Sequence, residues 1–265
     1  MKDNEIYTYA IAWIREAGER IKESFKATLN VETKSNPNDL VTNIDKETEQ
    51  FFITRINEKF PEHRVLGEEG NGDDLEELTG VVWIIDPIDG TMNFVHQQRN
   101  FAISVGIYED GVGKIGLIYD VVHDELYHAK RGEGAFMNKT PLPKLKKVKV
   151  HEAVIGLNAT WVTANRRIDP SLLGALVKDV RGTRSYGSAA IEMAQVAAGR
   201  LDAYITLRLS PWDFAAGLIL IEEVGGVAST LRGEPINLLE QNSVFISKPG
   251  LFDEVLQGYL KDGNW

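Results

Sequence analysis

The segment from Trp83 to Thr91 reads Trp-Ile-Ile-Asp-Pro-Ile-Asp-Gly-Thr, which joins an apolar run directly to two carboxylates and a turn. The short continuous apolar run from Val81 to Ile85 predicts a strand covered on both faces, with Asp86 at its end. Pro87 fixes its own φ angle and has no N–H group, so we expect a sharp turn that aims Asp86 and Asp89 at one point. This pattern predicts a metal-assisted phosphate site.

The residues around this segment are strongly acidic. From Val65 to Gly90 there are eight acidic side chains and no lysine or arginine. Carboxylates gathered in one pocket repel one another, and a bound cation is the simplest remedy. Gly90 and Thr91 predict the start of a helix, whose free N–H groups can hold a phosphate oxygen. An Asp-x-x-Asp pair alone is more often a helix cap beside a surface acid, but the flanking strand and Gly-Thr favour a site.

Two further stretches place chemistry at the ends of predicted elements. Glu68 lies in Gly67-Glu68-Glu69-Gly70, which follows a short apolar strand. Acids in a glycine-rich turn are common, so this motif alone is weak evidence for a site. Ser210-Pro211-Trp212-Asp213 predicts a helix start in which Ser210 is the N-cap and Asp213 lies in the first turn, where the helix dipole favours an anion. Capping and metal ligation by Asp213 are compatible. Gly187-Ser188-Ala189 predicts the start of another helix. Small residues there would let a ligand come close to the backbone N–H groups, and close packing of the helix explains them equally well.

The composition limits the possible functions. The chain has 265 residues, 43% hydrophobic, and a net charge of −10, which argues against general nucleic-acid binding. It has no cysteine, which excludes disulfides, thiolate zinc sites and cysteine nucleophiles. The histidines show no ligand-like spacing, so an all-oxygen site for Mg²⁺ is expected. No run approaches the roughly 18 apolar residues of a membrane span, and the N-terminus does not resemble a secretory signal, which predicts a cytoplasmic protein.

The pattern of elements predicts an α/β protein in two parts. We expect an α+β metal- and phosphate-binding domain at 1–150 and an α/β substrate domain at 151–265 that supplies Asp213. The first would contain an amphipathic helix at 4–27 capped by Asp3 or Asn4, a loop at 34–39, a helix from near Asp45 to before Pro61, and an antiparallel meander at 101–136. The second would contain strands at 153–158, 201–206, 226–231 and 243–247 and helices at 171–180, 188–198, 211–224 and 251–260.

Three motifs, in this order, resemble the magnesium-dependent, lithium-sensitive phosphomonoesterases typified by inositol monophosphatase. They are Gly67-Glu68-Glu69, then Trp83 to Thr91 continuing to Asn93-Phe94-Val95-His96, then Pro211-Trp212-Asp213 continuing to Ala215-Ala216-Gly217 with Gly225-Gly226 beyond. The resemblance spans nearly the whole chain. It implies a layered αβαβα sandwich of the inositol monophosphatase and fructose-1,6-bisphosphatase type, usually a homodimer.

The resemblance also implies roles for individual residues. The ligands of two or three Mg²⁺ ions would be Glu68, Asp86, the backbone carbonyl of Ile88, Asp89 and Asp213. The phosphate group would be held by Gly90 and Thr91, and the substrate would also contact Ile88, Asp89 and Asp213. The attacking water would be oriented by Asp45 and Thr91 together with Glu68. The alcohol portion of the substrate would contact Gly187, Ser188 and Ala189.

The expected reaction is hydrolysis of a small phosphate monoester by metal-activated water, with inositol 1-phosphate as the leading substrate. Inositol-recognising members carry a glutamate seven residues before the third-motif aspartate, whereas this chain has Thr206 there, followed by Leu207 and Arg208. A cation in that place suits a second anionic group, so fructose 1,6-bisphosphate and the 2′-phosphate of NADP are alternatives. A third hypothesis, a regulatory or RNA-associated role on this scaffold, conflicts with the acidic charge.

Overall fold

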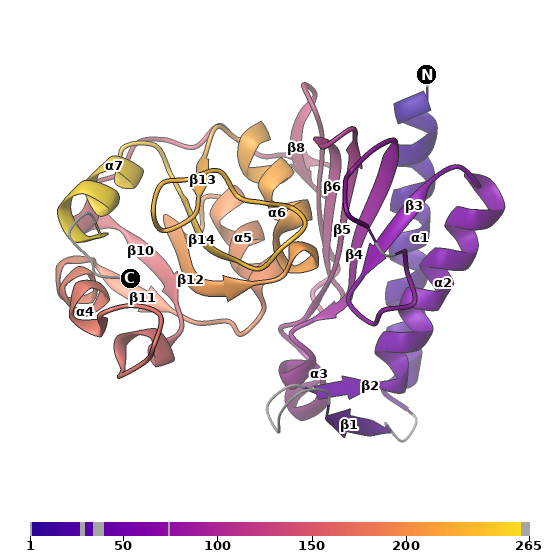
Figure 1. Cartoon of the computed structure of the whole chain (residues 1–265), viewed down its shortest axis with the longest axis horizontal. Coiled ribbons are helices and arrows are strands. Elements are labelled where there is room, and N and C mark those ends of the chain that lie inside the picture. The colour runs from indigo at the N-terminus through magenta and orange to yellow at the C-terminus, as the bar shows by residue number, and fades with distance from the viewer. Residues whose placement is uncertain (1, 27–29, 34–39, 74, 261–265) are drawn as a thin grey trace.

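The computed structural model describes residues 2–26, 30–33, 40–73 and 75–260, which form five alternating layers of helix and sheet (Figure 1). From right to left in Figure 1 the layers are α1 (Lys2–Ser24) with α2 (Asn43–Lys59), a seven-stranded sheet, α5 (Ala189–Ala197) with α6 (Pro211–Glu223), a five-stranded sheet, and α4 (Pro170–Asp179) with α7 (Leu251–Val255). The predicted αβαβα sandwich is confirmed. None of the described helices combines the length and the apolar character that crossing a membrane requires.

The seven-stranded sheet has the order β3-β4-β5-β6-β7-β8-β9. Its strands are β3 (Arg64–Gly67), β4 (Val81–Asp89), β5 (Ala102–Glu109), β6 (Val112–Asp120), β7 (Glu125–Lys130), β8 (Gly134–Met137) and β9 (Thr140–Pro141). Strands β3 and β4 are parallel, and each later neighbour is antiparallel, which confirms the predicted meander.

The prediction that the strand ends at Asp86 and turns sharply at Pro87 is wrong. The strand continues to Asp89, and its register shifts because Asp86 pairs with Ser104 while Asp89 pairs with Ala102. Three steps on β4 therefore match two steps on β5, the signature of a bulge, which is a position where a proline without an N–H is tolerated. In a regular strand Asp86 and Asp89 would face opposite sides. The extra residue lets both carboxylates face the α5–α6 layer.

The five-stranded sheet is mixed, with the order β11-β10-β12-β14-β13. Its strands are β10 (Val154–Leu157), β11 (Gly182–Arg184), β12 (Ala203–Leu209), β13 (Val227–Ser229) and β14 (Asn242–Ser247). Strand β10 runs parallel to β11 and β12, and β14 runs antiparallel to β12 and β13. Short helical turns η1 (Val150–Glu152) and η2 (Ala159–Val162) flank β10, and α7 continues into the π-helical η3 (Leu256–Leu260), which splits the predicted final helix.

One helix start differs from the prediction, and a second agrees with it. Helix α1 begins at Lys2, so Asp3 lies inside the first turn, where the helix dipole favours its charge, and is not the predicted cap. Helix α2 begins two residues before Asp45, because Thr42 is the N-cap and forms a capping box with Asp45. The ribbon of β1 (Val31–Thr33) and β2 (Leu40–Thr42) was not expected. Helix α1 ends at Ser24, before the predicted end at about residue 27. The predicted loop at 34–39 lies outside the described residues.

The middle helix layer contacts the seven-stranded sheet at unusually short range. Gly106 on β5 and Gly116 on β6 are register partners beneath α6. A Cβ atom built on Gly106 would lie 2.9 Å from the carbonyl carbon of Ala215. Two facing glycines therefore let α6 lie directly on the sheet, and this close packing brings the first turn of α6 to β4.

Candidate active site

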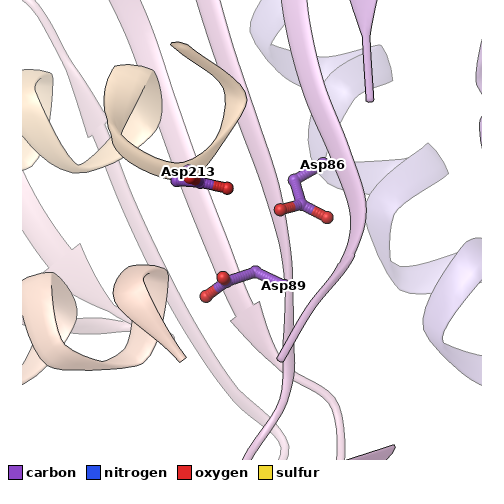
Figure 2. Close-up of side chains that lie close together, drawn as sticks. All are labelled: Asp86, Asp89 and Asp213. Atoms are coloured by element: carbon purple, nitrogen blue, oxygen red, sulfur yellow. The ribbon is translucent and has the colours of Figure 1, made fainter. Parts of the chain in front are cut away.

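Three carboxylates from the two halves of the chain meet between β4 and α6. Asp86 and Asp89 project from β4, and Asp213 projects from the first turn of α6 toward the same space (Figure 2). One carboxylate oxygen from each lies within 4.8 Å of the others. Asp86 is 1% exposed and Asp89 7% exposed, while Asp213 is half-buried. Such a buried group of like charges is electrostatically unfavourable without a cation.

Burial, together with the neighbouring charges, raises the pKa values of all three carboxylates. Desolvation raises the pKa of Asp86 well above its ordinary value, and the charges of Glu68, Asp89 and Asp213 raise it further. Desolvation also raises the pKa of Asp89 to about 6, although hydrogen bonds from Ser188 and Ala190 oppose the shift. For Asp213, desolvation and the charge of Asp89 raise the pKa well above the ordinary value. A divalent cation reverses this balance, because it favours the charged carboxylates.

Helix α5 holds Asp89 in place. The Ser188 hydroxyl, at the N-cap, donates to Asp89 Oδ2, and the N–H group of Ala190 donates to the same oxygen at 2.7 Å. Sequence reasoning placed this helix start against the alcohol portion of a substrate. In the structure the Ser188 hydroxyl donates to Asp89, and Gly187, Ser188 and Ala189 all line the adjacent cavity.

Asp213 is positioned by the start of α6, as the sequence predicts. The N–H group of Ser210 donates to Asp213 Oδ2 at 2.7 Å, and Ser210 and Asp213 form a capping box with Pro211 at the first turn. One carboxylate oxygen is thus used for capping, and the group still belongs to the three-carboxylate cluster. Capping and membership of the cluster are compatible here.

Asp45, Thr91 and Ile88 form a second polar group beside the cluster. The Thr91 hydroxyl lies 3.1 Å from Asp45 Oδ1 and 3.0 Å from the Ile88 carbonyl oxygen, so its single proton can go to either acceptor. Asp45 is 1% exposed and accepts the N–H group of Thr42 at 2.9 Å. Burial raises the pKa of Asp45, hydrogen bonds from Thr42 lower it, and the charge of Glu68 raises it.

Glu68 comes directly after β3 and faces both groups. Its charge raises the pKa values of Asp45, Asp86, Asp89 and Asp213, so Glu68 lies within electrostatic reach of both groups. Gly90 precedes α3 (Thr91–Gln97) with a φ angle of 94°, and a Cβ atom there would lie 3.2 Å from Ser188 Cβ. A glycine is therefore required where β4, α3 and α5 converge.

A cavity of about 240 Å³ opens beside Asp89 and Asp213. Several of the predicted substrate contacts line it, namely residues 187–189, Thr206, Asp89 and Asp213. The further lining residues, which sequence reasoning missed, are Asn158, Trp161, Ser185, Glu192, Tyr204, Ile205 and Leu209. Arg208 is exposed on β12 and does not line this cavity, so the structure does not place the predicted cation in it.

Glu192 is the most unusual of the missed residues. It is 2% exposed, its Oε1 accepts the N–H group of Tyr186 at 2.7 Å, and its Oε2 has no hydrogen-bond partner in the described structure. Burial raises its pKa to about 7, and the charge of Asp89 contributes. The available signal was a single acid within the otherwise small and apolar helix 189–198.

Comparisons with known proteins show which family the chain belongs to. The model of the inositol monophosphatase family matches residues 2–262. The inositol-1-monophosphatase of Bacillus subtilis (strain 168) is 66% identical over 256 residues, which cover 97% of each chain. A structure of inositol monophosphatase II from Staphylococcus aureus, bound to inositol monophosphate, is 46% identical and superimposes with a TM-score of 0.88, covering 97% of this chain and 94% of that one. An inositol monophosphatase/NADP phosphatase complexed with Mg²⁺ and phosphate is 30% identical with a TM-score of 0.89, covering 97% and 95%.

The fold and the family match define a phosphoric monoester hydrolase. The chain belongs to the inositol monophosphatase family.

Proposed function

We propose that the protein hydrolyses inositol 1-phosphate with Mg²⁺ bound at the carboxylate cluster. The observation that carries this proposal is the meeting of Asp86, Asp89 and Asp213, with one oxygen of each within 4.8 Å of the others, beside a cavity that Asp89 and Asp213 line. The relatives support the substrate, since the Bacillus subtilis protein is an inositol-1-monophosphatase and the staphylococcal structure contains inositol monophosphate.

The donor set fits magnesium. The side chains that would hold it are Asp86, Asp89, Asp213 and Glu68, with the carbonyl oxygen of Ile88, and oxygen donors of this kind suit Mg²⁺ rather than a softer metal. When bound, Mg²⁺ lowers the pKa of a coordinated water and stabilises the charge that develops on the phosphate and the leaving oxygen. Two or three ions per site belong to this proposal, as does inhibition by Li⁺, for which a LiCl-soaked inhibitory complex of a staphylococcal relative gives support.

The Asp45–Thr91 pair would orient the nucleophilic water. When the Thr91 hydroxyl donates its proton to Asp45 Oδ1, its oxygen lone pairs remain available to accept a hydrogen bond from water. The buried Asp45 carboxylate, whose pKa is raised by burial, is suited to receive a proton through this hydroxyl. The N–H groups at the start of α3, next to Gly90, would hold the phosphate oxygens.

A 2′-phosphorylated nucleotide is the second candidate substrate. Trp161, half-buried on η2, lines the cavity and offers an aromatic surface on which a base can stack. The staphylococcal relative has also been solved with 2′-AMP, and that chain is 47% identical. Fructose 1,6-bisphosphate has weaker support, because Arg208 lies outside the cavity, although a Thermotoga maritima relative carries both activities in its name.

A phosphate-release panel tests these assignments. We expect Mg²⁺-dependent release from inositol 1-phosphate, inhibition by Li⁺, and a loss of more than about 100-fold in kcat for Asp89→Asn, comparable with removal of one transition-state stabilising group. Asp120→Asn is the matched control, because Asp120 is 5% exposed on the same sheet but outside the cluster. A higher kcat/KM for 2′-AMP than for inositol 1-phosphate would replace the first substrate by the second. Metal-independent release would reject the proposal.

Three predictions from the sequence stay part of this proposal. They are the division into domains at about residue 150, the homodimer, and the cytoplasmic location. The division has physical support in the two sheets, which lie on either side of that position in the chain. Independent folding of 1–150 and 151–265 is not part of the proposal, because α6 packs on β5 and β6.

A further inference from the structure

Glu49 is a buried carboxylate on α2 that belongs to neither polar group of the proposed site. It is 0% exposed. Its Oε2 accepts the N–H group of Glu69 at 2.8 Å, and its Oε1 accepts the N–H group and the side-chain Nδ2 of Asn71, both at 3.0 Å. Within the described part of the chain, all the hydrogen bonds that Glu49 accepts come from this one loop.

The loop is held on both sides of Glu68. A Cβ atom built on Gly67 would overlap Glu49 Oε2, so the carboxylate packs directly on the backbone before Glu68. The N–H group after Glu68, that of Glu69, is the donor to the same oxygen. The backbone that carries Glu68 is therefore fixed at the residue before it and at the residue after it.

Helix α2 connects this loop to the second polar group. Asp45 and Glu49 are four residues apart on α2, so they lie on one face, about 6 Å apart along the helix axis. Asp45 accepts the Thr91 hydroxyl at 3.1 Å, and Glu49 accepts the Glu69 N–H group. A single rigid helix thus sets the spacing between Thr91 and the backbone of Glu68.

We infer that Glu49 is a positioning residue: its carboxylate fixes the loop 67–71 so that the Glu68 side chain reaches the metal-binding carboxylates. The inference rests on the proposed function, in which Glu68 is a Mg²⁺ ligand. A carboxylate is required because both of its oxygens accept N–H groups. A glutamine has one acceptor oxygen, so its NH₂ group would face a backbone N–H donor.

The experiment combines Glu49→Gln and Glu68→Gln, singly and together, in the full chain. Isothermal titration of the metal-free proteins with Mg²⁺ measures affinity without any substrate. We expect Glu49→Gln to weaken Mg²⁺ binding by about 10- to 100-fold, the range for groups that orient a ligand. Added to Glu68→Gln, it should change the affinity less than about 2-fold, because the residue that it positions is already lost.

A second readout needs no metal. Amide hydrogen exchange at Glu69 and Asn71 should accelerate in metal-free Glu49→Gln and stay unchanged in Glu68→Gln, since only the first variant removes an acceptor from those N–H groups. Glu47→Gln is the control, because Glu47 is exposed on the same helix and the substitution changes the net charge equally. Should Glu49→Gln fail to fold, Asn71→Ala removes one of the three hydrogen bonds from the loop side. It should weaken Mg²⁺ binding in the same direction.

The outcomes separate this inference from the proposed function. Mg²⁺ affinities that fall independently and multiplicatively in the double variant would overturn the inference, as would unchanged affinity in Glu49→Gln. Unchanged affinity in Glu68→Gln would also overturn it, since Glu68 would then be no ligand. If the wild-type protein released no phosphate from any monoester while the double-variant pattern held, the proposed function would fail and the positioning role of Glu49 would stand.

Discussion

The metal-free protein should lose stability as pH rises, because Asp89 must ionise where it is buried and close to other carboxylates. The ordinary pKa of an aspartate, 3.8, is raised to about 6 at Asp89. The folded state therefore binds this proton more tightly than the unfolded state, so the group destabilises the folded state progressively from pH 3.8 to about 6, and fully above that. A difference of about 2 pKa units corresponds to about 3 kcal/mol.

The variant Asp89→Asn isolates this contribution because asparagine does not titrate. The free energy of unfolding can be measured by urea denaturation in EDTA, with tryptophan fluorescence as the signal, from about pH 4 to about pH 8. The stability of Asp89→Asn relative to wild type should rise by about 3 kcal/mol across that range. Saturating Mg²⁺ should raise the free energy of unfolding of the wild type at high pH, and it should not do so for the variant. If the difference in unfolding free energy between the two proteins stayed constant with pH, Asp89 would not be the group that titrates.

Three further substitutions test neighbouring contacts. Ser188→Ala removes the hydroxyl that donates to Asp89, so the pKa of Asp89 should rise further and Mg²⁺ affinity should fall about 10-fold by titration calorimetry. Burial raises the pKa of Glu192 to about 7, so its ionisation should destabilise the wild type by about 3 kcal/mol as pH rises from 4.5 to about 7. Glu192→Gln should remove this loss, which urea denaturation across the range measures. Parallel curves of unfolding free energy against pH for the two proteins would contradict the prediction. Tyr108→Phe removes the 2.8 Å hydrogen bond to the Ala215 carbonyl and should lower the free energy of unfolding by about 1 kcal/mol; no change in the denaturation midpoint would contradict it.

Much of the fold was predictable because its elements have strong local signals. The apolar run of β4, the alternating strands of the meander and the Ser-Pro start of α6 each lie where the pattern placed them. The pattern predicted that Asp86 and Asp89 converge, but it assigned the cause to a sharp turn at Pro87 and not to a bulge within β4. A spacing of three in a strand puts side chains on opposite faces, and the bulge that returns them to one face depends on pairing with β5.

The supporting residues of the site were hidden for a different reason. Glu49 and Glu192 occupy helix positions where an acid is ordinary, and their burial is decided by what packs against the helix. For Glu49 that neighbour is the loop at 67–71, and for Glu192 it is the backbone before α5. These contacts join segments that are distant in sequence, and no local periodicity predicts that such segments come together. Arg208 shows the converse, since its place in the sequence predicted a cavity contact and the structure leaves it exposed.

The most direct test of the account is to locate a divalent ion in the protein. Mn²⁺ shares the preference of Mg²⁺ for oxygen ligands and scatters anomalously, so crystals soaked in Mn²⁺ would reveal its position. If Asp86, Asp89 and Asp213 form the metal site, an anomalous peak will lie within bonding distance of their carboxylate oxygens. Anomalous peaks confined to other parts of the molecule, with none between β4 and the first turn of α6, would contradict it.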